Sequence, residues 1–269
     1  MPMSTVVKAW MQLNRDAHRV CKDAADRLVA YEPSDAFVHI CGAFLRKGAE
    51  TFSVVNVLYA NHLEEPAQSL IRILFELRIN FDCFLNIAQS DAKNAVQRVA
   101  DSMMLEKIKQ ARASGFIGIP NEIKELLEQN EKQIVSRYHE NDLSRMRKHG
   151  FTGVPIEQRA SMTGHEAAYN VVYRNFSRNI HSTDYVESYL KARIYDLSYQ
   201  EQYLESRDLV AHYVAHFSAV GMAEFANGVF GLGLEKELDQ LGQRQKEIKA
   251  MKEALPNKPI NLDFLKGSP

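Results

Sequence analysis

Cysteine is scarce in this sequence, and its placement excludes a disulfide or zinc framework. Cys21, Cys41 and Cys83 are odd in number, widely spaced and surrounded by apolar residues. A disulfide scaffold uses an even set of cysteines, and a zinc site uses closely spaced pairs. We therefore expect three reduced thiols in the interior of the protein.

Long apolar runs are also missing. No window approaches the roughly 20 apolar residues that a membrane-spanning helix needs, and the N-terminal segment lacks the unbroken apolar core of a secretory signal. These absences predict a cytoplasmic protein that does not enter a membrane.

The charges are balanced, so the chain has no strong field of one sign. Lys and Arg number 33, Asp and Glu number 34, and the formal net charge is −1. Any binding to nucleic acid must therefore come from a local basic patch.

One basic run lies in an irregular segment. Residues 142–164 show no sustained period and contain several Gly and Pro residues, which predicts a long loop. Within it, Arg145, Arg147 and Lys148 are candidate contacts for RNA phosphates. Ordinary solvated loop charges are the alternative interpretation.

Alternating strand patterns are nearly absent, and helical periodicity dominates the chain. We predict an all-α protein, a multi-helix bundle of about seven to nine helices. The expected organisation is a helical bundle domain over residues 1–232 and a C-terminal amphipathic helix with an extended tail over residues 233–269.

The most apolar helix is expected near residues 66–89. On a helical wheel one arc is entirely apolar and predicts the face that lines the core, namely Leu70, Ile73, Leu77, Phe81 and Phe84. The opposite side is mixed. There Arg72 and Glu76, one turn apart, are expected to form an ion pair that either neutralises itself or supports a site on a neighbouring helix.

The stretch VYRNFSRNIHSTDY, residues 172–185, has a polar stripe along an otherwise apolar helix. One arc of this helix is apolar and contains Tyr169, Val172, Tyr173, Phe176 and Ile180. Another arc carries the polar stripe, which consists of Asn170, Arg174, Ser177, Arg178 and His181. Such a stripe can be a catalytic face, a buried hydrogen-bonded network or a solvated surface.

The segment Arg174-Asn175-x5-His181 resembles the arginine–polar–x(3–5)–histidine signature of HEPN-domain proteins. These are helical-bundle proteins that include metal-independent ribonucleases of toxin–antitoxin and anti-phage systems. The segments RILFELRINFD and YRNFSRNIHST also resemble a family of uncharacterised helical bacterial proteins, known only as a domain of unknown function, over roughly residues 45–230.

The HEPN resemblance implies a HEPN-like core and a metal-independent endoribonuclease without a cofactor, or a degenerate relative. His181 would act as general acid or base on the ribose 2′-hydroxyl or the leaving 5′-oxygen, because histidine titrates near neutrality. Arg174 would hold the phosphate, Asn175 would orient the histidine or the substrate, and Ser177 lies on the same stripe. Because HEPN proteins commonly dimerise around one cleft, RNA and a second copy of the chain are the implied partners.

Two further hypotheses remain open. Asp208, His212 and His216 recur every four residues, so a metal-dependent enzyme could use them as ligands, or the histidines could simply pack in a helix interface. The other hypothesis is a non-catalytic interaction or scaffold protein. It rests on the apolar helices and on near-heptad spacing in the C-terminal segment, which would pair with another helix or subunit through Leu234, Leu238, Leu241, Ile248 and Leu255.

Overall fold

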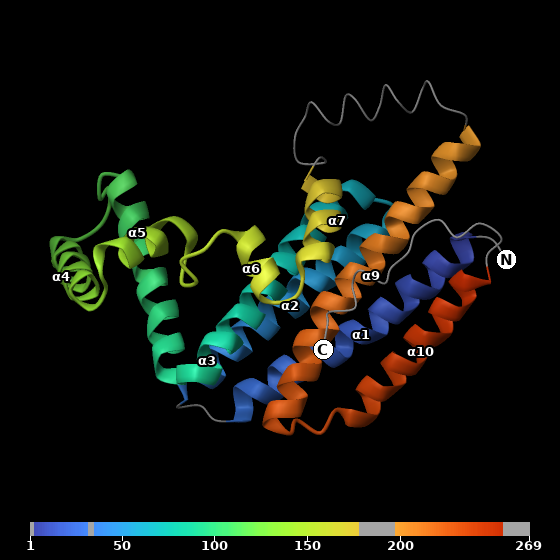
Figure 1. The fold of residues 1–269 in the computed structure, drawn as a ribbon, viewed down its shortest axis with the longest axis horizontal. Helices are drawn as coiled ribbons and strands as arrows, with labels where there is room; N and C mark the ends of the chain where they lie inside the picture. The colour runs from blue at the N-terminus through green and yellow to red at the C-terminus, as the bar shows by residue number, and fades with distance from the viewer. Residues whose placement is uncertain (1–2, 32–34, 178–196, 255–269) are drawn as a thin grey trace. The chain divides into compact units, whose positions relative to one another are not determined.

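The computed structural model describes residues 3–31, 35–177 and 197–254. Every regular element in these ranges is a helix, which confirms the all-α multi-helix prediction (Figure 1). The nine helices in the described residues are α1 Met3–Tyr31, α2 Ala36–Ala60, α3 Glu64–Ala113, α4 Asn121–Arg137, α5 Glu140–His149, α6 Ile156–Met162, α7 Glu166–Ser177, α9 Leu197–Phe230 and α10 Glu235–Glu253.

The chain forms two compact units. Unit 1 combines residues 1–81 with residues 164–269, and unit 2 is the continuous segment 82–163. The helix α3 begins in unit 1 and ends in unit 2. The boundaries of these units differ from the expected division at residue 232, which stays a prediction.

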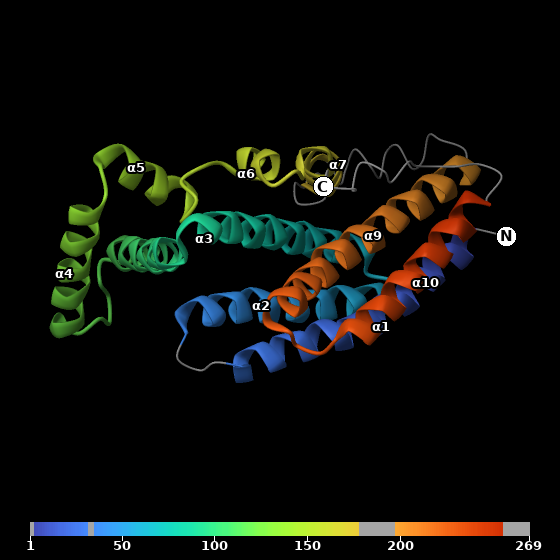
Figure 2. The same cartoon turned by 60° about the horizontal axis from the view of Figure 1, so that its bottom comes forward.

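Helix α1 is central to unit 1, where it packs against α2, α9 and α10 (Figures 1 and 2). Apolar residues recur along it every three or four positions, so that one face of the helix can be buried continuously. This face is buried as the periodicity predicts, through Val6, Trp10, Leu13, Ala17 and Ala24.

The last helix, α10, packs within its own chain. The near-heptad residues Leu234, Leu238, Leu241 and Ile248 are buried, and Leu255 lies outside the described residues. Arg244 of α10 donates from Nη1 to Oδ2 of Asp16 in α1, at 2.8 Å. The apolar stripe of α10 is therefore used inside unit 1.

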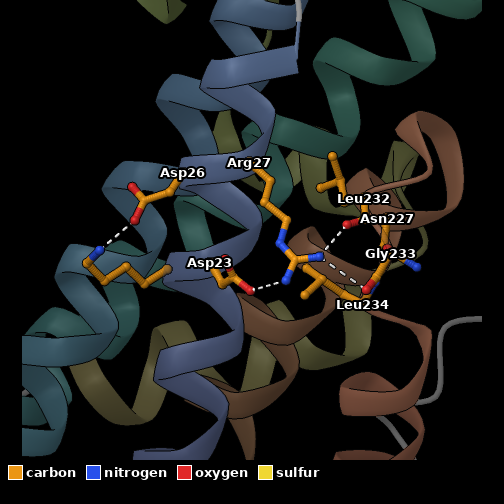
Figure 3. Close-up of polar contacts among 8 residues, drawn as sticks. Asp23, Asp26, Arg27, Asn227, Leu232, Gly233 and Leu234 are labelled. Atoms are coloured by element: carbon orange, nitrogen blue, oxygen red, sulfur yellow. Dashed lines mark hydrogen bonds and ion pairs between the residues drawn. The ribbon is translucent and has the colours of Figure 1, made fainter.

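The turn between α9 and α10 is held by polar side chains (Figure 3). Arg27 of α1 donates from Nη1 to the carbonyl oxygens of Leu232, at 2.7 Å, and Gly233, at 3.1 Å. Its Nη2 donates to Asp23, while the side-chain oxygen of Asn227 accepts from the backbone nitrogen of Leu234. These contacts satisfy backbone groups that the end of one helix and the start of the next leave exposed.

Helix α3 buries residues on both of its sides. Of the predicted apolar arc, Phe81 and Phe84 are fully buried and Leu70 and Leu77 are half-buried. Ile73 is half exposed, whereas Ile71, Phe75 and Ile79 on the mixed side are fully buried. Both sides carry enough apolar surface to enter a core, and the position of the neighbouring helices decides between them. The expectation for Ile73 was therefore wrong.

The same helix is interrupted at Asp91, whose backbone is not helical (φ −159°, ψ 97°). The Asp91 carboxylate accepts a hydrogen bond from the backbone nitrogen of Asn94 at 3.0 Å. This is the bond of an N-cap residue, so Asp91 ends one helical segment and starts the next.

Unit 2 has a small apolar cluster of its own. Leu105, Ile134, Leu143 and Met146 bury one another, from α3, α4 and α5. The segment expected to be a long loop thus contains two helices, α5 and α6. Gly150, with φ of 75°, ends α5 in a conformation that favours glycine.

Two expectations from the scarce residue types can be compared with the structure. Cys21, Cys41 and Cys83 are free and buried, as predicted, and burial raises the pKa of the Cys21 and Cys41 thiols to about 12. Among the described helices, none is both long enough and apolar enough to cross a membrane.

Candidate functional site

Helix α7 carries the first part of the polar stripe and is anchored by its apolar face. Of the predicted apolar arc, Tyr169, Val172 and Phe176 are buried, Tyr173 is half-buried, and Ile180 lies outside the described residues. Burial of this arc fixes the rotation of α7 about its axis.

The stripe itself is described only in part. Asn170 is half-buried, and Arg174, Asn175 and Ser177 lie within α7 but their side chains are outside the described part of the chain. Arg178 and His181 lie outside the described residues altogether. The catalytic assignment of this stripe stays a prediction.

Side chains of α3 and α7 form a cluster that includes Tyr173, the residue directly before Arg174. The Arg72 side chain donates from Nε to Oε1 of Glu76 at 3.0 Å, so the expected ion pair is present. The guanidinium of Arg72 also stacks over the ring of Tyr173, with its central carbon 4.1 Å from the ring centroid. Tyr173 in turn stacks on Tyr169, with 4.8 Å between centroids. We call Arg72, Glu76, Tyr169 and Tyr173 the α3–α7 cluster.

The α3–α7 cluster fixes α7 against α3, and its two charged side chains remain partly exposed to solvent. The Arg72 and Glu76 side chains are 22% and 32% exposed, so neither charge is fully removed from water. The role of Tyr173 was not anticipated, because an aromatic residue on an apolar helical arc has no signature that distinguishes stacking on arginine from ordinary packing.

A second arginine of α3 is half-buried and contacts α9. Arg78 lies with its guanidinium over the ring of Phe217, 5.6 Å from the centroid. A β-carbon added at Gly221 would lie 2.0 Å from Nη1 of Arg78, so glycine is what lets the guanidinium approach α9. Burial raises the pKa of nearby Glu224, and the positive charge of Arg78 opposes that shift. These contacts indicate a structural role for Arg78.

The interior of unit 1 contains a polar centre that the sequence did not reveal. Asn14 of α1 is fully buried between His212 and His216 of α9, which are buried as well. Its Nδ2 lies 3.1 Å from the backbone oxygen of His212 and 3.3 Å from Nδ1 of the same residue, and its Oδ1 lies 3.1 Å from Nδ1 of His216. One amide thus contacts both histidines.

These contacts define where the protons are. A backbone oxygen can only accept, so the amide nitrogen of Asn14 must face it, and that nitrogen donates to Nδ1 of His212. His212 therefore carries its proton on Nε2. His216 carries a proton on Nδ1 and donates it to Oδ1 of Asn14.

Both rings are held in the neutral form. Burial lowers the pKa of His212 and of His216 to about 3, and the positive charges of Lys249 and Arg244 add to the effect at His216. Asp208, one turn before His212, accepts from Nε2 of Gln68 at 3.4 Å. Burial raises the pKa of Asp208 to about 6, even though Arg207 acts in the opposite direction.

The alternative metal site at Asp208, His212 and His216 is not formed. No group of three His, Cys, Asp or Glu side chains in the described residues could hold a metal ion. In the described structure Nδ1 of each histidine is directed to Asn14, while the Asp208 carboxylate is directed to Gln68. The four-residue spacing reflects histidines packed in a helix interface.

The basic run of unit 2 lies in α5, and only part of it lines a groove. Arg147 and Lys148 of α5 line a groove with residues of α3 and α4, whereas Arg145 does not line it. Arg147 donates from Nη2 to Oε1 of Glu131 at 3.1 Å. Contact of the run with RNA stays a prediction.

Comparison with known proteins gives one match. A model described as a family of unknown function (DUF5677) matches residues 38–193, which is more than half of the chain and includes α7 and the segment from Arg174 to His181. No curated protein and no solved structure matches the chain.

Proposed function

The chain belongs to the DUF5677 family of unknown function, and from its own residues we propose that it is a HEPN-like, metal-independent endoribonuclease or a degenerate relative of one. The observation that carries the proposal is the segment Arg174-Asn175-x5-His181, which begins in a helix anchored on its opposite face. The proposal includes a homodimer that works in the cytoplasm in toxin–antitoxin or anti-phage defence.

The proposed chemistry uses groups that are suited to phosphodiester cleavage without a metal. The ribose 2′-oxygen attacks the phosphorus and the bond from phosphorus to the 5′-oxygen breaks, which leaves a cyclic phosphate and a 5′-hydroxyl. His181 takes the proton from the 2′-hydroxyl or gives one to the leaving 5′-oxygen. Arg174 stabilises the charge that develops on the phosphate oxygens.

Dimerisation would supply the second proton transfer. Arg174 and His181 are seven residues apart, which is about 10 Å along a continuous helix, so both can approach one phosphate from the same stripe only if the helix ends at His181. A second copy of the stripe, facing the first across a cleft, would bring an arginine and a histidine to each side of the substrate.

The α3–α7 cluster supports this proposal by giving α7 a fixed position. Arg72 is engaged by both Glu76 and Tyr173, the residue directly before Arg174. Glu76 is a carboxylate one helical turn from Arg72 and is the group we propose to orient Arg174 or His181. Asn170 and Arg178, on the same stripe, would support the substrate.

The alternative is a non-catalytic interaction or scaffold protein. The near-heptad residues Leu234, Leu238, Leu241 and Ile248 are buried within unit 1, so a partner would have to dock on another surface. RNA cleavage that depends on His181 distinguishes the two proposals.

Cleavage of a fluorescently labelled single-stranded RNA in the presence of EDTA tests the proposal. The purified full-length chain should cut the RNA, and His181→Ala and Arg174→Ala should each lower the rate by at least 100-fold, which is the order expected for a general acid–base group. Loss of the histidine removes the proton transfer while leaving the described apolar face of α7 intact.

His62→Ala is the matched control, because the His62 side chain is 92% exposed in unit 1 and has no part in the stripe. It should cleave at the parent rate, and all variants should retain the parent circular dichroism spectrum. Parent-like cleavage by His181→Ala would rule the proposal out.

A further inference from the structure

Unit 2 has a groove between α3, α4 and α5 with a volume of about 530 Å³. Its floor includes the buried apolar residues Leu105, Ile108 and Met146. Its rim carries four cations, Lys109, Arg112, Arg147 and Lys148, and two carboxylates, Glu106 and Glu131. An apolar floor with a charged rim is the composition that a ligand with both apolar and ionic parts requires.

Glu131 organises the two arginines of this groove. Arg112 donates to both oxygens of Glu131, through Nη1 at 3.0 Å and through Nη2, and Arg147 donates to Oε1 at 3.1 Å. The Glu131 side chain is only 14% exposed, whereas those of Arg112 and Arg147 are 53% and 48% exposed. The carboxylate therefore lies beneath two guanidinium groups that remain accessible to solvent.

The arginines retain most of their hydrogen-bonding capacity. A guanidinium has five N–H donors, and the contacts with Glu131 use two donors of Arg112 and one of Arg147. Pairing with the mostly buried Glu131 carboxylate thus fixes the orientation of both guanidinium groups while leaving N–H donors for a second anion. Planar guanidinium groups held in this way are suited to phosphate oxygens.

The positive charge of unit 2 is concentrated at this groove. Residues 82–163 contain 12 Lys and Arg and 11 Asp and Glu, so the unit as a whole is almost neutral. The groove has four cations against two carboxylates, a larger surplus than that of the entire unit. Basic residues in the last turn of a helix interact favourably with the helix dipole. That interaction alone does not bring cations of two helices together around one carboxylate.

We propose that this groove binds the sugar–phosphate backbone of single-stranded RNA, with phosphates at the arginines and lysines and the ribose or base edge against the apolar floor. This inference rests on the RNA substrate of the proposed function, and it adds Lys109 and Arg112 to the contacts that the basic run suggested. Arg145 is outside the groove and makes no contribution to it.

The test compares two double variants that remove the same charge from unit 2. Lys109→Gln with Lys148→Gln removes two groove cations, one from α3 and one from α5, while leaving both arginines on Glu131. Lys107→Gln with Lys132→Gln is the matched control, because both residues are exposed, lie in α3 and α4, and do not line the groove. Both are made in the His181→Ala chain, so that bound RNA is not cut.

Binding is measured by fluorescence anisotropy with a labelled 12-nucleotide single-stranded RNA over a series of salt concentrations in EDTA. The groove variant should bind at least tenfold more weakly, and the slope of log affinity against log salt should fall by about 1.4, because two phosphate contacts are lost. The control should change affinity less than twofold. Both variants should unfold at the parent temperature.

Equal binding by the two double variants overturns the inference, and so does a parent chain that binds no RNA. The cleavage assay distinguishes this failure from failure of the proposed function. RNA cleavage that depends on His181 but not on Lys109 and Lys148 would leave the nuclease proposal intact. Groove-dependent binding without cleavage would retain the inference and reject the nuclease.

Discussion

Unit 1 and unit 2 each contain one polar side chain that contacts two others, but these two centres differ in their exposure to water. In unit 1, Asn14 is fully buried and contacts His212 and His216. In unit 2, Glu131 keeps some exposure and contacts Arg112 and Arg147, which face solvent. The first centre joins α1 to α9, and the second joins α4 to α3 and α5.

The difference shows why similar connectivity supports different roles. At the Asn14 centre the partners are neutral rings inside the core, and the hydrogen bonds specify how two helices pack. At the Glu131 centre the partners are permanent charges at the surface, and their remaining donors can meet an external anion. Burial turns a polar cluster into a structural element, and exposure leaves it available for binding.

Acid should destabilise unit 1 through its histidines, and this is the largest effect we expect. An unfolded histidine titrates near 6.5 and the folded rings titrate near 3, so between these values the unfolded chain binds more protons and stability falls as the pH is lowered. Each histidine costs about 1.4 kcal/mol per pH unit in this window. Asp208 opposes one of them between about pH 6 and 3.8, because its folded pKa is raised.

The net prediction is a loss in the free energy of unfolding of about 1.4 kcal/mol from pH 6 to pH 5, and of about 4 kcal/mol from pH 6 to pH 3, measured by urea titration at each pH. Asp208→Asn removes the opposing group and should make the decline about twice as steep. A stability that is constant over this range would contradict the assignment of neutral, buried histidines.

Removing the buried centre of unit 1 should have the next largest effect. Asn14→Leu is similar in volume but leaves Nδ1 of His212 and of His216 without their partner. We expect the free energy of unfolding to fall by about 3 kcal/mol, because unsatisfied buried polar groups cost about 1–3 kcal/mol each. The loss is measured by urea denaturation.

Gln12→Leu is the control for this variant, since Gln12 is exposed on the same helix and bonds only to surface neighbours. It should change the stability by less than about 0.5 kcal/mol. Similar losses for the two substitutions would show that Asn14 has no special role in the core.

The smallest effect should come from removing the charge at the centre of unit 2. Glu131→Gln keeps the shape of the side chain and one accepting oxygen, so we expect a loss of about 1 kcal/mol in stability. Hydrogen exchange should place this loss within residues 82–163, because local contacts control local opening. A loss as large as that of Asn14→Leu, or one spread over unit 1, would break the contrast between the two centres.

The sequence predicted the elements with a single strong pattern. The residues of α1 that recur every three or four positions, such as Trp10 and Leu13, are buried, and Asp91 caps a helix as its residue type suggests. In each case one local property, either apolar spacing or capping chemistry, decides the structure on its own.

Other features depended on contacts that a single sequence does not contain. Both sides of α3 are apolar enough to be buried, so only its neighbours decide that Phe75 is inside and Ile73 outside. The helix α5 buries only Leu143 and Met146, and its charged residues obscured that short pattern. At the candidate site, the Arg72–Glu76 pair followed from its spacing, but the stacking on Tyr173 and the role of Asn14 arise from tertiary placement alone.

The arrangement of the two units also sets an order for their folding during synthesis. Unit 2 is one uninterrupted segment, so all of its residues are available once residue 163 has left the ribosome. Unit 1 needs α9 to enclose the buried face of α1, and Asn14 must wait about 200 residues for its histidines. A nascent chain stalled before α9 should therefore contain a folded unit 2 and an incomplete unit 1 whose exposed α1 face is a target for chaperones.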